Sequence, residues 1–350
     1  MKDKVAWGVV GSCGIARRRT IPEGIVPAAN SKLVGLYDCN HEGNAEVART
    51  FGAHAFGSLE ELLAAEIDAV YIATPVYLHG EQTTRCLKAG KHVLCEKPLA
   101  LSVAEGREMV ALAQRSKVQL GAAFMMRFHS QHQEAARLIQ SGKLGKPVYG
   151  RAQLSCWYPP LEGAWRQDPS QGGGGSLADM GVHCIDLLEM FLGPVVSVSC
   201  CIGNLVHSYR SEDSALATLV FENGALGTVD TFFCIPDESS RNVLELYGSE
   251  GSILAKGTIG QGSQGEMVFC PRPQGTGYDA QQNRDTGQGI PLQPPPINTY
   301  RAEIEEFSQA ILAGKKSELA GDLGLRSQRI LEACYESART SQTVRIEDHA

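Results

Sequence analysis

The sequence has 350 residues, of which 43% are hydrophobic and 20% charged, and its formal net charge is −7. This length suits one large domain or two ordinary ones. The acidic balance argues against nucleic-acid binding, because phosphate contacts need a concentrated basic surface. No segment has the roughly 18 uninterrupted apolar residues of a membrane span, and the first residues do not resemble a signal or transit peptide. We therefore expect a cytoplasmic protein with neither a nucleic-acid nor a membrane partner.

Eleven cysteines are scattered from Cys13 to Cys334, and none are spaced as C-x-x-C. This spacing does not favour a disulfide framework or a zinc site. We expect free thiols in a reducing compartment and no bound metal.

Residues 1–124 alternate short β-branched runs with helical patterns, which is typical of a parallel sheet covered by helices. Capping boxes begin at Ser58 and Ser102, and a further helix is expected at 78–89. Strands are predicted at 5–10, 33–37, 69–73, 93–95 and 118–122. The sequence therefore predicts an N-terminal α/β domain.

The pattern changes in residues 125–350, where strand-like runs dominate. Asn223-Gly224 joins two of these runs and is a strong hairpin signal. A helix is expected near 131–140, strands at 148–156, 195–202, 215–221, 225–233 and 243–247, and helices at about 299–313 and 323–338. We expect a second domain of α+β type with a mostly antiparallel sheet. The polar stretch 257–296 has little periodicity and is expected to be a functional or mobile loop.

A glycine-rich turn follows the first predicted strand. Gly11, Cys13 and Ala16 have the spacing of a dinucleotide-binding fingerprint, with cysteine in place of the middle glycine. The following helix would direct its first backbone N–H groups at a phosphate. Such turns are common, so the motif is weak by itself. The predicted contacts with the cofactor are made by Gly11, Ser12, Cys13, Gly14 and Ile15.

Asp38 follows Ala16 by 22 residues, at the end of the second predicted strand. A carboxylate there accepts hydrogen bonds from ribose hydroxyls and repels a 2′-phosphate, so NAD is favoured over NADP. The alternative is that Asp38 caps a turn or helix.

Two further motifs, Thr74-Pro75 with His79 and Glu96-Lys97-Pro98, follow predicted strands and so lie at the carboxyl edge of the sheet, where ligands bind. A lysine in such a crevice is a candidate acid/base or electrostatic catalyst. The alternative is a solvated loop lysine.

Asp179 and His183 are spaced i and i+4, which places them on one face of a helix. A carboxylate beside an imidazole would raise its basicity and fix its tautomer. The alternative for His183 is a core histidine, the role we expect for His92, His129, His132 and His207. Asp186 could join the pair or solvate the helix, and we favour the second.

Taken together, these motifs resemble those of the glucose-fructose oxidoreductase, inositol dehydrogenase and rhizopine-catabolism (Gfo/Idh/MocA) family. The resemblance rests on 73–79 (ATPVYLH), 96–98 (EKP), 165–169 (WRQDP), 173–183 (GGGSLADMGVH) and 337–340 (SART). It implies a Rossmann domain and a second domain whose open sheet often forms an oligomer interface, here of a homodimer or homotetramer. Cys13 departs from the family pattern, because many members have glycine or alanine there.

The resemblance also implies roles for individual residues. Lys97, Asp179 and His183 would line the reacting carbon of the substrate, and Arg127, Trp165 and Arg166 would contact substrate or nicotinamide. Thr74, Pro75, His79, Glu96 and Lys97 would contact the cofactor.

We expect an NAD-dependent oxidoreductase that transfers a hydride to or from a CH–OH or carbonyl carbon of a sugar, cyclitol or glycoside. In this hypothesis His183 is the base, oriented by Asp179, and Lys97 stabilises the alkoxide. Two alternatives stay open: a lyase or hydrolase that uses NAD transiently on a glycoside, and a non-catalytic NAD-binding sensor.

Overall fold

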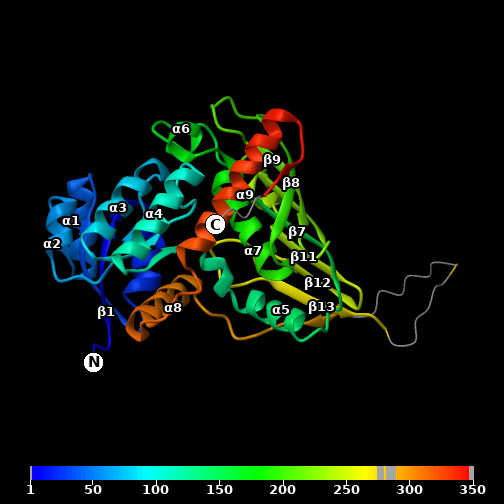
Figure 1. The fold of residues 1–350 in the computed structure, drawn as a ribbon, viewed down its shortest axis with the longest axis horizontal. Helices are drawn as coiled ribbons and strands as arrows, with labels where there is room; N and C mark the ends of the chain where they lie inside the picture. Colours follow the sequence, from blue (N-terminus) through cyan, green and yellow to red (C-terminus); the bar gives the residue numbers. More distant parts are fainter. Residues whose placement is uncertain (1, 274–279, 281–288, 347–350) are drawn as a thin grey trace.

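The computed structural model describes residues 2–273, 280 and 289–346, and contains two sheets that lie side by side (Figure 1). The N-terminal sheet has six parallel strands in the order β3-β2-β1-β4-β5-β6. This order is that of a Rossmann domain and confirms the predicted parallel sheet. The strands are β1 (Val5–Val10), β2 (Ser31–Tyr37), β3 (His54–Ala55), β4 (Ala69–Ile72), β5 (His92–Cys95) and β6 (Leu120–Ala122).

Helices connect these strands. Ser58 and Ser102 cap their helices by accepting hydrogen bonds from Glu61 N and Glu105 N, as the capping boxes predict. Helix α1 was not predicted, because its few buried apolar side chains form no clear periodic stripe. The helical segments are η1 (Ser12–Ile25), α1 (His41–Phe51), α2 (Leu59–Ala64), α3 (His79–Lys88) and α4 (Val103–Ser116).

The C-terminal sheet has nine strands in the order β14-β13-β12-β11-β7-β10-β9-β8-β15. Every strand pair is antiparallel except β7 with β10, which confirms a mostly antiparallel sheet. The strands are β7 (Pro147–Ser155), β8 (Val195–Gly203), β9 (Ser214–Phe221), β10 (Leu226–Phe232), β11 (Val243–Gly248), β12 (Gly251–Lys256), β13 (Glu266–Pro271), β14 (Ile290–Pro291) and β15 (Val344–Arg345).

The predicted loop at 257–296 is wrong in part. Strand β13 lies within it and pairs with all six residues of β12, and β14 pairs with β13. Met267 and Phe269 of β13 are buried, so tertiary packing overrides the polar composition of the segment. Residues 274–279 and 281–288 of this stretch lie outside the described part of the chain.

One face of the C-terminal sheet packs against helices and the other does not. Strand β9 alternates buried Ala217 and Leu219 with exposed Leu216 and Val220, as a sheet covered on one side requires. The helical segments that follow β6 are η3 (Met125–Phe128), α5 (Ser130–Gln140), η4 (Trp165–Gln167), α6 (Pro169–Gly172), η5 (Leu177–Gly181), α7 (Val182–Leu192), η6 (Asp237–Ser239), α8 (Thr299–Ala313) and α9 (Gly321–Thr340).

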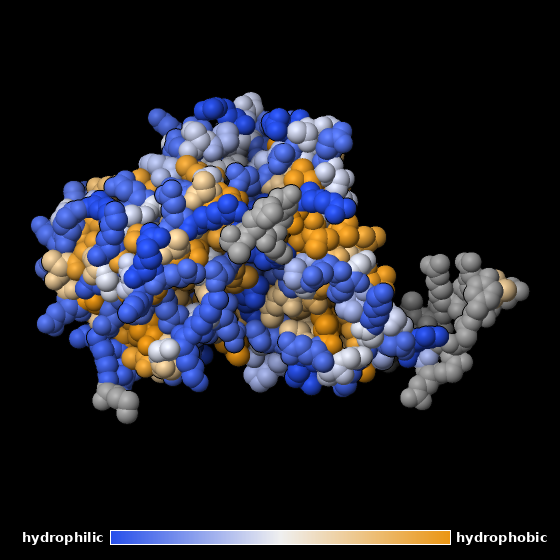
Figure 2. All heavy atoms as spheres, viewed as in Figure 1, coloured by the Kyte–Doolittle hydropathy of each residue, from blue (hydrophilic) through white to orange (hydrophobic). Residues whose placement is uncertain are grey.

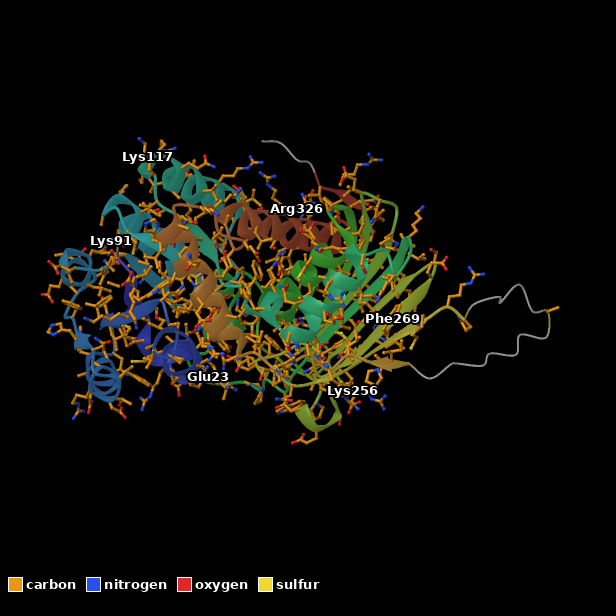
Figure 3. All side chains as sticks on the ribbon, turned by 90° about the horizontal axis from the view of Figure 1, so that it is seen from below. Glu23, Lys91, Lys117, Lys256, Phe269 and Arg326 are labelled. Atoms are coloured by element: carbon orange, nitrogen blue, oxygen red, sulfur yellow. The ribbon has the colours of Figure 1, made fainter. Side chains whose placement is uncertain are left out.

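Helix α8 packs on the N-terminal sheet, although the sequence-based division places it in the second domain. Phe307 lies in the same apolar cluster as Trp7, and the Trp7 indole N–H donates to Ser308 Oγ at 3.1 Å. Arg326 of α9, labelled in Figure 3, donates through Nε to Glu189 of α7 at 2.8 Å. These helices therefore connect the two sheets and bring α7 toward the Rossmann strands.

Candidate active site

The glycine-rich turn joins β1 to η1. Gly11 has a φ of +84°, and a Cβ there would lie 2.7 Å from the Ala73 carbonyl carbon, so only glycine fits. Ser12 is buried and donates to Asn44 Oδ1 at 2.8 Å. A Cβ on Gly14 would meet nothing closer than Ala73 O at 3.9 Å. The turn is thus tightly held on one side and open beside Gly14 and the half-buried Ile15.

Asp38 directly follows β2 and reaches back to this turn. Its Oδ2 accepts from Cys13 N at 2.9 Å, and its Oδ1 accepts from Asn40 N at 2.9 Å. Burial is the main cause that raises the pKa of the Cys13 thiol, which therefore stays protonated beside the carboxylate. Asp38 caps the local turn, as the alternative reading expected, and also lies at the strand end, where a ribose is bound in Rossmann domains.

His79 connects the loops that follow β4 and β5. Its ring nitrogens lie 2.9 Å from Thr74 O and 2.9 Å from Pro98 O, and the Thr74 hydroxyl donates to Gln82 Oε1. Burial lowers the pKa of His79 to about 4, so the ring is neutral. Because both ring nitrogens face loop carbonyls, His79 has no free nitrogen for the cofactor contact expected from the sequence. It instead holds Lys97-Pro98 in place.

Lys97, Asp179 and Arg166 form one charge cluster. Lys97 Nζ donates to Asp179 O at 2.7 Å and to Asp179 Oδ1 at 2.9 Å, and Arg166 Nε lies 3.0 Å from the same Oδ1. Burial by itself would raise the pKa of Asp179, but Arg166 and Lys97 together hold it well below its usual range. Asp179 is therefore an ionised carboxylate that fixes two cations.

His183 lies in this neighbourhood but is not bonded to Asp179, which corrects the expected pair. Burial first, and Lys97 second, lower the pKa of His183 well below its usual value, with only a partial opposing effect of Asp179. Its Nδ1 has no hydrogen-bond partner among the described residues. The physical reason is that the Asp179 carboxylate is bound by the Lys97 ammonium and the Arg166 guanidinium instead.

The remaining predicted contact residues are Trp165, which lies beside this cluster, and Arg127, which pairs with another carboxylate. The Arg166 guanidinium stacks 4.0 Å from the centre of the Trp165 ring. Arg127 Nε donates to both carboxylate oxygens of Asp186, at 2.9 and 2.8 Å, and Asp186 is buried. The expectation that Asp186 solvates the helix is wrong, because the charge of Arg127 compensates its burial.

Glu96 is held behind Lys97. Its Oε1 accepts from Tyr71 Oη at 2.6 Å and its Oε2 from Lys97 N at 3.3 Å, and Thr20 of η1 donates to Tyr71 Oη at 3.1 Å. This chain of hydrogen bonds runs from the helix of the glycine-rich turn to the lysine, so Glu96 positions Lys97.

The sequence analysis did not identify Tyr158, which is half-buried and lies close enough to the Arg166 guanidinium for its charge to act on the tyrosine hydroxyl. Burial raises the pKa of Tyr158, so its hydroxyl is a neutral donor and acceptor. The aromatic run Trp157-Tyr158 directly after a strand is the signal that could have found it. In the part of the chain that the structure describes, no cluster of His, Cys, Asp or Glu forms a candidate metal site, and no helix could span a membrane.

A Rossmann sheet whose strand ends face an acid/base cluster is the architecture of a dinucleotide-dependent oxidoreductase. Residues 5–124 match the model of an oxidoreductase family with an NAD-binding Rossmann fold, and residues 132–254 match the Gfo/Idh/MocA C-terminal domain. The chain belongs to the Gfo/Idh/MocA family, and it is a dehydrogenase of the type that acts on CH–OH groups.

Individual relatives are similar over almost the whole chain. The 1,5-anhydro-D-fructose reductase of Ensifer adhaerens is 30% identical over 345 residues, covering 97% of this chain and 98% of the relative. The D-xylose 1-dehydrogenase (NADP(+)) 2 of Haloferax volcanii is 27% identical, covering 97% and 99%. The aldose-aldose oxidoreductase of Caulobacter crescentus, a crystal structure with glycerol, has a TM-score of 0.85 at 24% identity, covering 98% and 99%.

The residues present fit a nicotinamide dinucleotide. The open face beside Gly14 lies at the N-terminus of η1, where backbone N–H groups favour a pyrophosphate. The carboxylate of Asp38 lies at the end of the neighbouring strand, in reach of the same turn. Thr74 and Pro75 complete the edge of the sheet between this turn and Lys97.

Proposed function

We propose that this protein transfers a hydride between NAD and a CH–OH or C=O carbon of a sugar, cyclitol or glycoside. The observation that carries the proposal is the position of the Lys97 ammonium. An ammonium has three N–H donors, and among the described residues Lys97 directs two of them at Asp179. The third N–H is available to a substrate oxygen, and the lysine side chain is only 11% exposed.

When bound at the glycine-rich turn, NAD would supply the nicotinamide carbon for hydride transfer. His183 takes the hydroxyl proton of the substrate, because its low pKa keeps the imidazole neutral before the reaction. Lys97 donates to the same oxygen and stabilises the negative charge that develops on it. Asp179 holds Lys97 and Arg166 in place, and Arg166, Trp165 and Tyr158 line the substrate side of the cluster.

The preference for NAD over NADP rests on Asp38. Asp38 lies at the strand end, where Rossmann domains bind the ribose, and its carboxylate would repel a 2′-phosphate there. The next residues, Cys39-Asn40, carry no positive charge to compensate. One relative is named as an NADP(+) enzyme, so the choice of cofactor is specific to each chain.

A substrate screen tests the proposal. Aldoses, cyclitols and glycosides would be incubated with NAD, with NADH followed by absorbance and products by chromatography. Net NADH formation supports the dehydrogenase. Product without net NADH would indicate transient oxidation in a lyase or hydrolytic reaction, and NAD binding without any product would indicate a sensor.

We also propose that the open face of the C-terminal sheet binds a second copy of the chain in a homodimer or homotetramer. No helix covers this face in the part of the chain that the structure describes, and Figure 2 shows apolar residues on the side of the molecule where this sheet lies. Exposed apolar side chains on this face come from two neighbouring strands: Leu216 and Val220 of β9 and Leu226 of β10. Leu226 and Val220 are cross-strand partners, so the patch is continuous. The double variant Leu216→Glu, Leu226→Glu should be monomeric by light scattering, and an unchanged mass would contradict the proposal.

A further inference from the structure

Glu212 lies outside the acid/base cluster but contacts the segment that carries it. Glu212 stands just before β9 and is 6% exposed. It is far along the chain from η5 and from the three glycines at 173–175 that precede η5. Its Oε2 accepts from Gly175 N at 2.9 Å. Its Oε1 accepts from Leu177 N at 3.0 Å and from Tyr335 Oη at 2.9 Å.

These contacts replace the missing cap of the helix that holds Asp179 and His183. The first N–H groups of a helix need acceptors from outside it. Ser176, the residue before η5, gives no side-chain cap. Glu212 supplies both a carboxylate oxygen to Leu177 N and its own carbonyl oxygen to Ser176 N at 3.1 Å. The helix is therefore capped by a residue of another segment.

The glycines of the motif are explained by the same contact. A Cβ on Gly175 would collide with the Glu212 backbone, and one on Gly174 would collide with the Tyr335 hydroxyl. The loop thus approaches Glu212 too closely for any larger side chain. The Gly175 carbonyl accepts a hydrogen bond from Asp179 N at 3.0 Å. The loop that Glu212 binds is therefore hydrogen-bonded directly to η5, the segment that carries Asp179.

Glu212 forms no salt bridge with a described residue, and burial raises its pKa. A buried carboxylate without a cation partner costs stability. The backbone N–H groups that it binds offset part of this cost.

We infer that Glu212 is a positioning residue of the active site: by clamping Gly175 and Leu177 it sets the Asp179 carboxylate against Lys97, and Tyr335 links the clamp to α9. This inference rests on the proposed function only for its kinetic readout. The structural readout does not depend on any substrate.

The test compares Glu212→Gln with Glu222→Gln, a matched substitution at an exposed glutamate of the β9–β10 turn, in the full-length protein. An amide offers one acceptor oxygen and turns an N–H₂ group toward a backbone N–H, so one clamp bond is lost. Glu212→Gln should speed amide hydrogen exchange in 173–183 while the melting temperature stays close to that of Glu222→Gln. Exchange in 173–183 equal to that of the control would overturn the inference, whatever the activity of the protein.

Kinetic measurements distinguish a role of Glu212 in positioning Asp179 from a purely structural role as a helix cap. With a substrate from the screen, Glu212→Gln should lower kcat by about 10- to 100-fold with unchanged NAD affinity, because small displacements of catalytic groups are costly. In an Asp179→Asn background the same change should have little further effect, since both act through one group. An equal fold-loss in both backgrounds would overturn the inference and leave the proposed function intact.

Tyr335→Phe is the milder second variant, because it removes one hydrogen bond to Glu212 and leaves both backbone contacts in place. Tyr335→Phe should lower kcat by a smaller factor than Glu212→Gln does. A kcat equal to that of the unaltered protein would exclude a role of the Tyr335 contact, and so of the link to α9.

Discussion

The Lys97 ammonium donates two hydrogen bonds to Asp179, one to the carboxylate Oδ1 at 2.9 Å and one to the backbone carbonyl oxygen at 2.7 Å. The ammonium is thereby held with two of its N–H groups directed away from the space where the substrate oxygen would lie. Arg166 shares the same carboxylate oxygen. The cluster of Lys97, Asp179 and Arg166 therefore contains one anion and two cations, which favours a substrate that develops negative charge in the reaction.

The first prediction concerns this pair. Lys97→Ala should lower turnover by about 100- to 10,000-fold while NAD binding is retained, because the ammonium acts on the substrate oxygen. Asp179→Asn should lower it as well, and the double variant should be little worse than Lys97→Ala. Steady-state rates and NAD titrations check this, with Lys88→Ala of the exposed face of α3 as control. A Lys97→Ala protein as active as Lys88→Ala would make Lys97 a structural lysine.

The second prediction concerns the cofactor. NAD should bind at least about tenfold more tightly than NADP, which corresponds to a difference in binding free energy of about 1.4 kcal/mol. Asp38→Asn keeps an acceptor for Cys13 N but removes the negative charge, so it should reduce the ratio of NAD affinity to NADP affinity. The control Asp3→Asn, at an exposed site, should leave this ratio unchanged. Fluorescence titration with both cofactors measures the ratio. Equal affinities in the unaltered protein would refute the role of Asp38.

The third prediction concerns pH. His183 must be neutral to accept a proton, and burial and Lys97 hold its pKa well below 6.5. Activity in the oxidation direction should therefore fall only at a pH well below 6.5, as His183 becomes protonated. Asp179→Asn should move this acidic limb further down, because the carboxylate raises the pKa of His183. His183→Ala should abolish the limb.

Pre-steady-state NADH formation against pH isolates the chemical step. An acidic limb that is the same in His183→Ala and in the unaltered protein would assign the proton transfer to Lys97 instead.

The fourth prediction concerns stability. Glu303 of α8 is fully buried, and neither carboxylate oxygen has a hydrogen-bond partner among the described residues. Burial, with a smaller contribution from Glu96, raises its pKa well above 4.5. Below pH 4.5 the carboxyl is protonated in both the folded and unfolded protein. Above it the unfolded chain releases the proton more readily, so this group lowers the free energy of unfolding by up to about 1.4 kcal/mol per pH unit.

Glu303→Gln should remove this loss, so its stability relative to the unaltered protein should increase from pH 5 to pH 8. Chemical denaturation at several pH values measures it, and Glu336→Gln, on the exposed face of α9, is the matched control. A stability difference between Glu303→Gln and the unaltered protein that does not change with pH would show that Glu303 is ionised in the folded state.

Local patterns in the sequence were sufficient for much of the fold. Five of the six parallel strands, the glycine-rich turn, the caps at Ser58 and Ser102 and helix α8 were predicted, because periodicity, turns and caps depend on residues a few positions apart. The two-residue strand β3 was not predicted. The strand ends that carry Asp38 and Lys97 follow from the same patterns, since parallel strands end at one edge of the sheet.

Only the tertiary structure decided the partners of the charged groups. Lys97 and Asp179 are 82 residues apart, and Arg127 and Asp186 are 59 apart. Spacing along one helix suggested Asp179 with His183 and a solvated Asp186. In the folded chain Asp179 instead pairs with Lys97, and Asp186 is buried against Arg127. The contacts of Glu212 with Gly175 and Leu177 could not be predicted from the sequence either, because a helix cap supplied by a distant segment has no local sequence signal.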